Sequence, residues 1–153
     1  MARDLFRVVV HVLVWREAPA PAGDGGPDVE LFLLKRANTG FMDGYYALPG
    51  GHQDEGESVS EAAIRECHEE IAIIPRDLKP LSVMPYRSGR HQGLNFLFET
   101  TDYEGEPVVN EPELFDACCW VQPDRLPEPV AVWLPDALEL KRKHQWYREF
   151  EWD

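Results

Sequence analysis

Acidic residues cluster in the segment from Gly51 to Ile73, GHQDEGESVSEAAIRECHEEIAI. Side chains three or four residues apart are neighbours on a helix, so a helix here brings Glu66 beside both Glu69 and Glu70. Like charges at this spacing destabilise a helix. A chain that keeps three carboxylates together is expected to hold a cation, and hard divalent ions such as magnesium take carboxylate oxygens as ligands. The pattern therefore predicts metal-assisted chemistry, with a solvated acidic helix as the plain alternative.

The residues around the carboxylates predict the helix that positions them. Ser58 and Glu61 have the spacing of a capping box, which marks a helix start. Apolar residues at spacings of three and four predict a buried stripe, made of Ile64, Cys67 and Ile71. With about 3.6 residues per turn, the three glutamates fall on a different face from this stripe. Pro75 is expected to end the helix.

This segment resembles the Nudix box, the signature of a family of phosphohydrolases that includes MutT-like enzymes. The family pattern is Gly, five residues, Glu, seven residues, Arg-Glu, an apolar residue, any residue, Glu-Glu, any residue, Gly and an apolar residue. The matching positions in this chain are Gly51, Glu57, Arg65, Glu66, Cys67, Glu69, Glu70 and Ile73. Ala72 stands where the family has glycine. A left-handed residue there costs alanine about 1 kcal/mol, so we expect either strain or a different helix end.

Weaker marks extend the resemblance over roughly residues 8–138. They are Leu48-Pro49-Gly50, Arg36 to Gly40, Asp43-Gly44, Gly105 to Pro107, Glu111 to Glu113, and Trp120. The resemblance implies an α+β fold in which a mixed β-sheet is sandwiched between α-helices.

The resemblance also implies a catalytic site. Its metal ligands are Glu66, Glu69 and Glu70, together with the backbone carbonyl of Gly50, and one of the glutamates also serves as the base. Arg65 and Glu57 are implied to brace the loop against the helix as an ion pair that orients the ligands. Gly51 is expected to adopt a backbone geometry forbidden to other residues.

Members of the family often use a further acidic residue outside the box. Glu111 and Glu113 are the candidates, and we take Glu113 as the further metal ligand. A plain surface position is the equal alternative for both. Asp54 and Glu55 are expected to be solvated.

Aromatic and basic residues near the box supply candidates for substrate binding. A nucleobase is held by stacking and a few hydrogen bonds, and phosphates by arginines. The candidates are Arg36, Phe41, Tyr45, Tyr46, Arg87, Arg90 and Trp133. For the aromatic residues the alternative is a core or surface position, and for the arginines an exposed loop. His11, on an apolar strand, is expected to be a core residue with a satisfied hydrogen bond.

Length and composition limit the number of domains and the possible partners. The 153 residues predict a single domain over 1–153, and no apolar run approaches the length of a membrane span. The net charge of −13 disfavours binding to a nucleic acid polymer. Three cysteines, two of them adjacent, argue against a disulfide framework and for a reducing cytoplasm.

Hydrophobic patterning predicts the other elements. Strands are expected at 7–15, 30–35, 81–86, 93–100 and 117–121, and a second helix at 135–147. The segment 18–28, APAPAGDGGPD, is expected to be a flexible loop within a hairpin. Strands before and after a central helix favour an α+β fold.

The hypothesis for function is hydrolysis of a phosphoanhydride bond in a nucleoside diphosphate linked to a group X, with Mg²⁺ or, as a substitute, Mn²⁺. A (d)NTP or oxidised NTP, giving a monophosphate and pyrophosphate, is preferred over ADP-ribose, a nucleotide sugar or a dinucleoside polyphosphate. Two rivals are a non-catalytic nucleotide-binding module and an isoprenoid-diphosphate isomerase. The intact box glutamates oppose the first, and the expected burial of Cys67 opposes the second. A homodimer is left open.

Overall fold

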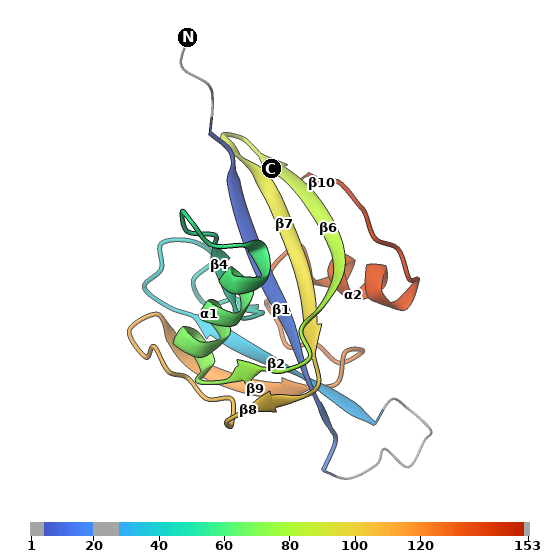
Figure 1. Ribbon diagram of the computed structural model, residues 1–153. Coiled ribbons are helices and arrows are strands. Elements are labelled where there is room, and N and C mark those ends of the chain that lie inside the picture. The colour runs from blue at the N-terminus through green and yellow to red at the C-terminus, as the bar shows by residue number, and fades with distance from the viewer. Residues whose placement is uncertain (1–4, 20–27, 152–153) are drawn as a thin grey trace.

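The computed structural model describes residues 5–19 and 28–151 (Figure 1). The long strands are β1 (Arg7–Glu17), β2 (Val29–Arg36), β6 (Lys79–Ser88), β7 (His91–Thr100) and β9 (Phe115–Val121). The short strands are β3 (Tyr46–Ala47), β4 (Gly50–His52), β5 (Ile74–Pro75), β8 (Tyr103–Glu104) and β10 (Phe150–Glu151). The helices are α1 (Val59–Ile71) and α2 (Leu134–Arg142). Neither helix is long and apolar enough to cross a membrane, a finding that covers the described residues.

Strand β1 is the centre of an eight-stranded mixed sheet with the order β10-β6-β7-β1-β2-β3. On one side β1 runs parallel to β7. On the other side its partner changes along its length, because β4 pairs antiparallel with Val9 to His11 and β2 pairs antiparallel with Trp15 to Glu17. Strand β9 pairs with β2, and β5 and β8 form a separate small sheet. The insertion of β4 brings the backbone that precedes α1 against the middle of the sheet.

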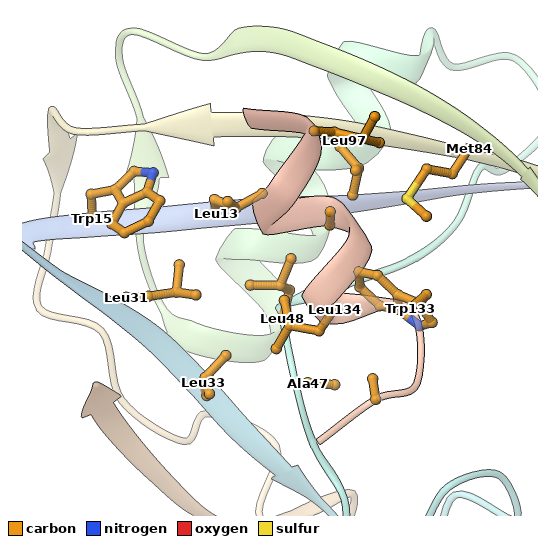
Figure 2. Close-up of a cluster of buried hydrophobic side chains, with 13 residues drawn as sticks. Leu13, Trp15, Leu31, Leu33, Ala47, Leu48, Met84, Leu97, Trp133 and Leu134 are labelled. Carbon is orange, nitrogen blue, oxygen red and sulfur yellow. The ribbon is translucent and has the colours of Figure 1, made fainter. Parts of the chain in front are cut away.

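Alternation along β1 and β2 produces two cores, one on each face of the sheet. One core gathers Val10, Val12, Val14, Phe32 and Leu34 with the buried side of α1. The other gathers Leu13, Trp15, Leu31 and Leu33 with α2, and Figure 2 shows this cluster around Leu134. Figure 1 shows the two helices on opposite sides of the long strands. The predicted α+β arrangement of a mixed sheet between helices is therefore confirmed.

The five predicted strands are present, each extended by one to several residues. The second helix is shorter than predicted, because the chain reverses into a left-handed conformation at His144 (φ 54°). The five short strands were not predicted, since two or three residues carry no periodicity. Residues 20–27 of the predicted loop lie outside the described residues, but the strands that flank it do pair as a hairpin.

Helix α1 begins as predicted but ends earlier. Ser58 accepts a hydrogen bond from the amide of Glu61, whose carboxylate bonds the amide of Ser58, so the capping box is confirmed. The helix ends at Ala72, with φ 60° and ψ 33°, three residues before the predicted stop at Pro75. Pro75 lies instead in β5. The alanine therefore adopts the left-handed conformation for which the family uses glycine.

Ala72→Gly is expected to raise the free energy of unfolding by about 0.5–1 kcal/mol. It relieves a left-handed alanine, which costs about 1–2 kcal/mol, and part of this gain is offset by the greater freedom of glycine in the unfolded chain. Urea unfolding of both proteins measures the difference. Ala62→Gly, inside the same helix, is the control and should lose stability. Equal or lower stability of Ala72→Gly contradicts the expectation.

Candidate active site

A cavity of about 750 Å³ opens beside α1. Its walls come from α1, β4, β1, β6 and β7, from the loop after β2, and from the segment before α2. The volume is in the range of about 300–1,000 Å³ that is usual for small-molecule sites. The lining includes a group of carboxylates, which we call the acidic wall, and several apolar and aromatic side chains, among them Met84, Ala131 and Trp133.

The acidic wall contains the three box glutamates of α1, Glu66, Glu69 and Glu70, but in different environments. Glu70 is buried, with 6% of its surface exposed, and accepts a hydrogen bond from the amide of Gly50 (3.2 Å). The side chain of Glu66 is 12% exposed and that of Glu69 is 49% exposed. The prediction that all three glutamates lie off the buried side of the helix is therefore wrong for Glu70. Packing of α1 against β4 covers this side chain, since the two elements are adjacent.

Burial has an electrostatic consequence for this pair of carboxyl groups. It raises the pKa of Glu70 well above the ordinary value, and the charge of Glu66 raises it further. Burial also raises the pKa of Glu66, and the two groups share a hydrogen bond. Two buried carboxyl groups in contact require a proton or a cation between them.

The carboxylate that joins this wall from outside the box is Glu111 rather than Glu113. Glu111 lines the cavity, and its pKa is raised by burial and by the charge of Glu69. The neighbouring Asn110 holds this segment against the end of α1. Its backbone amide donates to the carbonyl of Glu70 (2.9 Å), and its side-chain amide donates to the carbonyl of Glu69 (3.0 Å). Glu113 is exposed and does not line the cavity.

The donor set fits a hard divalent ion. Within the described residues, no three acidic, histidine or cysteine side chains converge closely enough to hold an ion as they stand. The wall nevertheless offers carboxylate oxygens from Glu66, Glu69, Glu70 and Glu111, and Gly50 lines the cavity with them. Carboxylate oxygens on an open wall suit magnesium, which binds through few protein ligands and keeps sites for water and phosphate.

Arg65 holds this wall to the loop before the helix. It bonds Glu57 in a bidentate manner, with Nη2–Oε1 of 2.7 Å and Nε–Oε2 of 3.0 Å, and it donates to the carbonyl of His52 (2.9 Å). Its Nη1 reaches Glu66 (3.0 Å) and Glu69 (3.2 Å). The expected ion pair between Arg65 and Glu57 is therefore present, and the same guanidinium also orients two of the cavity carboxylates.

The contact between Arg65 and Glu57 predicts a dependence of stability on pH. Hydrogen bonds from Arg65, and then from the amide of Asp54, lower the pKa of Glu57 to about 2. A folded-state pKa below the unfolded value of 4.5 stabilises the protein above pH 4.5, and this contribution is lost as the pH falls toward 2. The stability difference between wild type and Glu57→Gln, measured by urea unfolding, should therefore shrink over this range. A difference independent of pH contradicts the assignment.

Gly51 is required for close approach rather than for an unusual backbone. Its φ is not in the left-handed region, so the expectation of a forbidden geometry is wrong. A Cβ at this position would collide with Oε1 of Glu66 and would lie 2.6 Å from its Cδ. Glycine thus leaves room for the Glu66 carboxylate beside β4.

Gly51→Ala is expected to displace the Glu66 carboxylate while the fold persists, because the colliding atoms are the end of a flexible side chain. A displacement of this size costs about 10²-fold in kcat where the displaced group takes part in the reaction. Steady-state kinetics and thermal unfolding, measured together, test this. Unchanged kcat means that Glu66 does not need its present position.

Three of the seven predicted substrate-binding residues line the cavity. Arg36 does so with its Nε bonded to the carbonyl of Phe41 (2.7 Å), and burial lowers its pKa, against the opposing effect of Glu70. Trp133 also lines the cavity but is only 8% exposed, which limits the area it offers for stacking. Phe41, a further aromatic candidate, lines the cavity and is exposed.

The other four candidates are placed elsewhere. Tyr46 packs against the α2-side core, and Tyr45 is half-buried outside the cavity lining. Arg87 forms an ion pair with Glu151 of the neighbouring strand β10. Arg90 is exposed at the turn between β6 and β7. Chain proximity to the box did not bring the tyrosines to the cavity, and Tyr46 instead belongs to β3, which pairs with β2.

His11 is satisfied, as predicted, but it also belongs to the cavity. Its Nδ1 lies 2.8 Å from Oδ1 of Asn95, and its ring contacts that of Trp133, with centroids 4.3 Å apart. Burial lowers the pKa of His11 to about 4, so the ring is neutral at neutral pH. Both His11 and Asn95 line the cavity. The sequence signal was a polar residue on each of two apolar strands, but only the pairing of β1 with β7 brings them together.

Comparisons with known proteins agree with this geometry. An ADP-ribose pyrophosphatase of Methanocaldococcus jannaschii is 36% identical over 124 residues, which cover 74% of this chain and 69% of that protein. An 8-oxo-dGTP diphosphatase of Escherichia coli is 33% identical over 83 residues, which cover 54% of this chain and 64% of that protein. A MutT NUDIX hydrolase from Burkholderia pseudomallei has a similar structure, with a TM-score of 0.75, 27% identity and coverage of 90% of this chain and 98% of that one.

The NUDIX domain model matches residues 6–142, which include every residue of the acidic wall. Since the family's motif lies on that wall, with its arginine bonded to its first glutamate, sequence match and site geometry lead to one conclusion: the chain belongs to the NUDIX domain family and is a Nudix hydrolase.

Proposed function

We propose that this Nudix hydrolase cleaves a phosphoanhydride bond in a nucleoside diphosphate linked to a second group, with Mg²⁺ or Mn²⁺ as cofactor. The observation that carries the proposal is the grouping of four carboxylates on one wall of a nucleotide-sized cavity, namely Glu66, Glu69, Glu70 and Glu111. In this proposal Glu111 takes the role that was predicted for Glu113.

The residues of the chain have separate roles in the reaction. Bound Mg²⁺ supplies charge neutralisation of the phosphates and a more acidic water. Glu66, Glu69, Glu70 and Glu111 hold the cation, with the carbonyl of Gly50 as a further candidate. Arg65 and Glu57 keep the carboxylates oriented. Arg36, which lines the cavity, binds a phosphate of the substrate through its guanidinium group.

ADP-ribose is the first substrate to test. The relative named for it matches this chain over 124 residues, a longer stretch than the 83 residues matched in the 8-oxo-dGTP diphosphatase. The second candidate is an ordinary or oxidised (d)NTP, which the sequence favoured. The isomerase rival loses support, because Cys67 is fully buried outside the cavity lining and burial raises the pKa of its thiol.

The cytoplasm is the proposed location. The free thiols of Cys67, Cys118 and Cys119 support a reducing compartment.

A hydrolysis screen tests the proposal. The purified protein is incubated with ADP-ribose, (d)NTPs, 8-oxo-dGTP, nucleotide sugars and dinucleoside polyphosphates, in Mg²⁺, in Mn²⁺ and in EDTA. We expect metal-dependent turnover, with AMP and ribose 5-phosphate from ADP-ribose, or a monophosphate and pyrophosphate from a triphosphate. Turnover that persists in EDTA, or none on any substrate, contradicts the proposal.

A further inference from the structure

His11 and Asn95 form a polar pair within an apolar part of the cavity. The pair is joined by the bond of 2.8 Å between Nδ1 and Oδ1. The neighbouring lining is apolar and consists of Ala47, Met84, Ala131 and Trp133, three of which are labelled in Figure 2. A few fixed polar groups in an apolar lining are what orient a bound small molecule.

The surroundings hold the pair in one arrangement. Asn95 is 4% exposed and stands on β7, while His11 stands on the parallel neighbour β1. The ring of Trp133 lies against the ring of His11 at an interplanar angle of 45°. Side chains fixed by packing and by a mutual hydrogen bond lose little freedom when they bind a ligand.

Each member of the pair has a second polar atom that does not take part in the bond between them. These atoms are Nε2 of His11 and the amide nitrogen of Asn95, and both residues line the cavity. If Nδ1 donates to Asn95, Nε2 accepts and the amide nitrogen donates. If the amide is turned and the other tautomer is present, the two roles exchange. In both cases the neutral pair offers one donor and one acceptor.

We infer that His11 and Asn95 read the edge of the substrate's nucleobase, an inference that rests on the proposed nucleotide function. A phosphate at neutral pH offers acceptors alone, so it leaves the acceptor of the pair unmatched. The guanidinium of Arg36, elsewhere in the cavity lining, offers donors alone and suits a phosphate better. The pairing edge of a nucleobase carries a donor next to an acceptor, which matches the pair in either arrangement. The base therefore lies beside β1 and β7, while the phosphates lie toward α1.

Binding of nucleoside monophosphates tests this without turnover. AMP, GMP, CMP and UMP, which have no phosphoanhydride bond to cleave, are titrated into the protein in Mg²⁺ by calorimetry, with ribose 5-phosphate as the probe that lacks a base. We expect at least one monophosphate to bind more tightly than ribose 5-phosphate. His11→Phe and Asn95→Leu should reduce that preference by about tenfold, the usual value of one or two neutral hydrogen bonds. Affinity for ribose 5-phosphate should stay within about twofold.

His68→Phe makes the same change on an exposed histidine outside the cavity lining, and it should leave the preference unchanged. An unchanged preference in His11→Phe and Asn95→Leu, or equal loss of affinity for ribose 5-phosphate, overturns the inference, and the second result assigns the pair to ribose. The hydrolysis screen tests the proposed function separately, because it measures turnover of substrates and not affinity for monophosphates.

A measurement on the wild type covers the case in which a variant does not fold. In protein with ¹⁵N-labelled histidine, saturation with the tightest-binding monophosphate should shift the Nε2 resonance of His11, whereas ribose 5-phosphate should not. No shift of His11 at saturation contradicts the inference.

Discussion

Glu69→Gln is expected to lower kcat by about 10³-fold, a loss of about 4 kcal/mol in transition-state stabilisation. Glutamine keeps the size of the side chain but removes the charge that a divalent cation requires, and a bound metal supplies several kcal/mol of charge stabilisation. Since the side chain of Glu69 is 49% exposed and makes one i,i+4 ion pair, with Arg65, the fold should persist. Steady-state kinetics over a range of Mg²⁺ concentrations, with thermal unfolding, measures both effects.

Glu55→Gln is the matched control for this prediction. Glu55 is an exposed glutamate in the loop before the same helix, and it does not line the cavity. It should keep kcat within about twofold of wild type, as expected of an exposed charge without a specific contact. Near wild-type turnover in Glu69→Gln means that the acidic wall is not the metal site.

Arg65→Lys is expected to lower kcat by about 10- to 100-fold, the usual cost of losing a group that orients metal ligands. Lysine retains the positive charge but is a single point donor. It cannot make the bidentate bond to Glu57 while also reaching the carbonyl of His52 and the carboxylate of Glu66. The thermal midpoint should fall as well, because the same contacts join α1 to the loop before it.

Arg76→Lys is the control, because it makes the same substitution in an exposed pair. Arg76 contacts Asp102 at 3.3 Å, and both side chains are more than half exposed. Its kcat should stay within about twofold of wild type. If Arg65→Lys behaves in the same way, positive charge alone is sufficient and the geometry of the bonds is not needed.

The sequence by itself determined the parts of the site that are local along the chain. The helical period places Glu66, Glu69 and Glu70 within one turn of each other, and the capping box of Ser58 and Glu61 marks where that helix begins. Hydrophobic patterning likewise predicted the strands that became β1 and β2. In each case the relevant interactions join residues a few positions apart, so spacing alone specifies them.

Tertiary structure decided which distant residues meet. Asn95 reaches His11 through the register of β7 against β1, and Glu111 reaches the carboxylates because Asn110 docks on the end of α1. Arg87 follows Tyr86, which lines the cavity, so alternation along β6 turns Arg87 to the other face, where it pairs with Glu151 of β10. Burial of Glu70 also depends on the packing of α1 against β4. These contacts depend on how strands pair and helices pack across long separations in sequence, and no local pattern encodes that pairing.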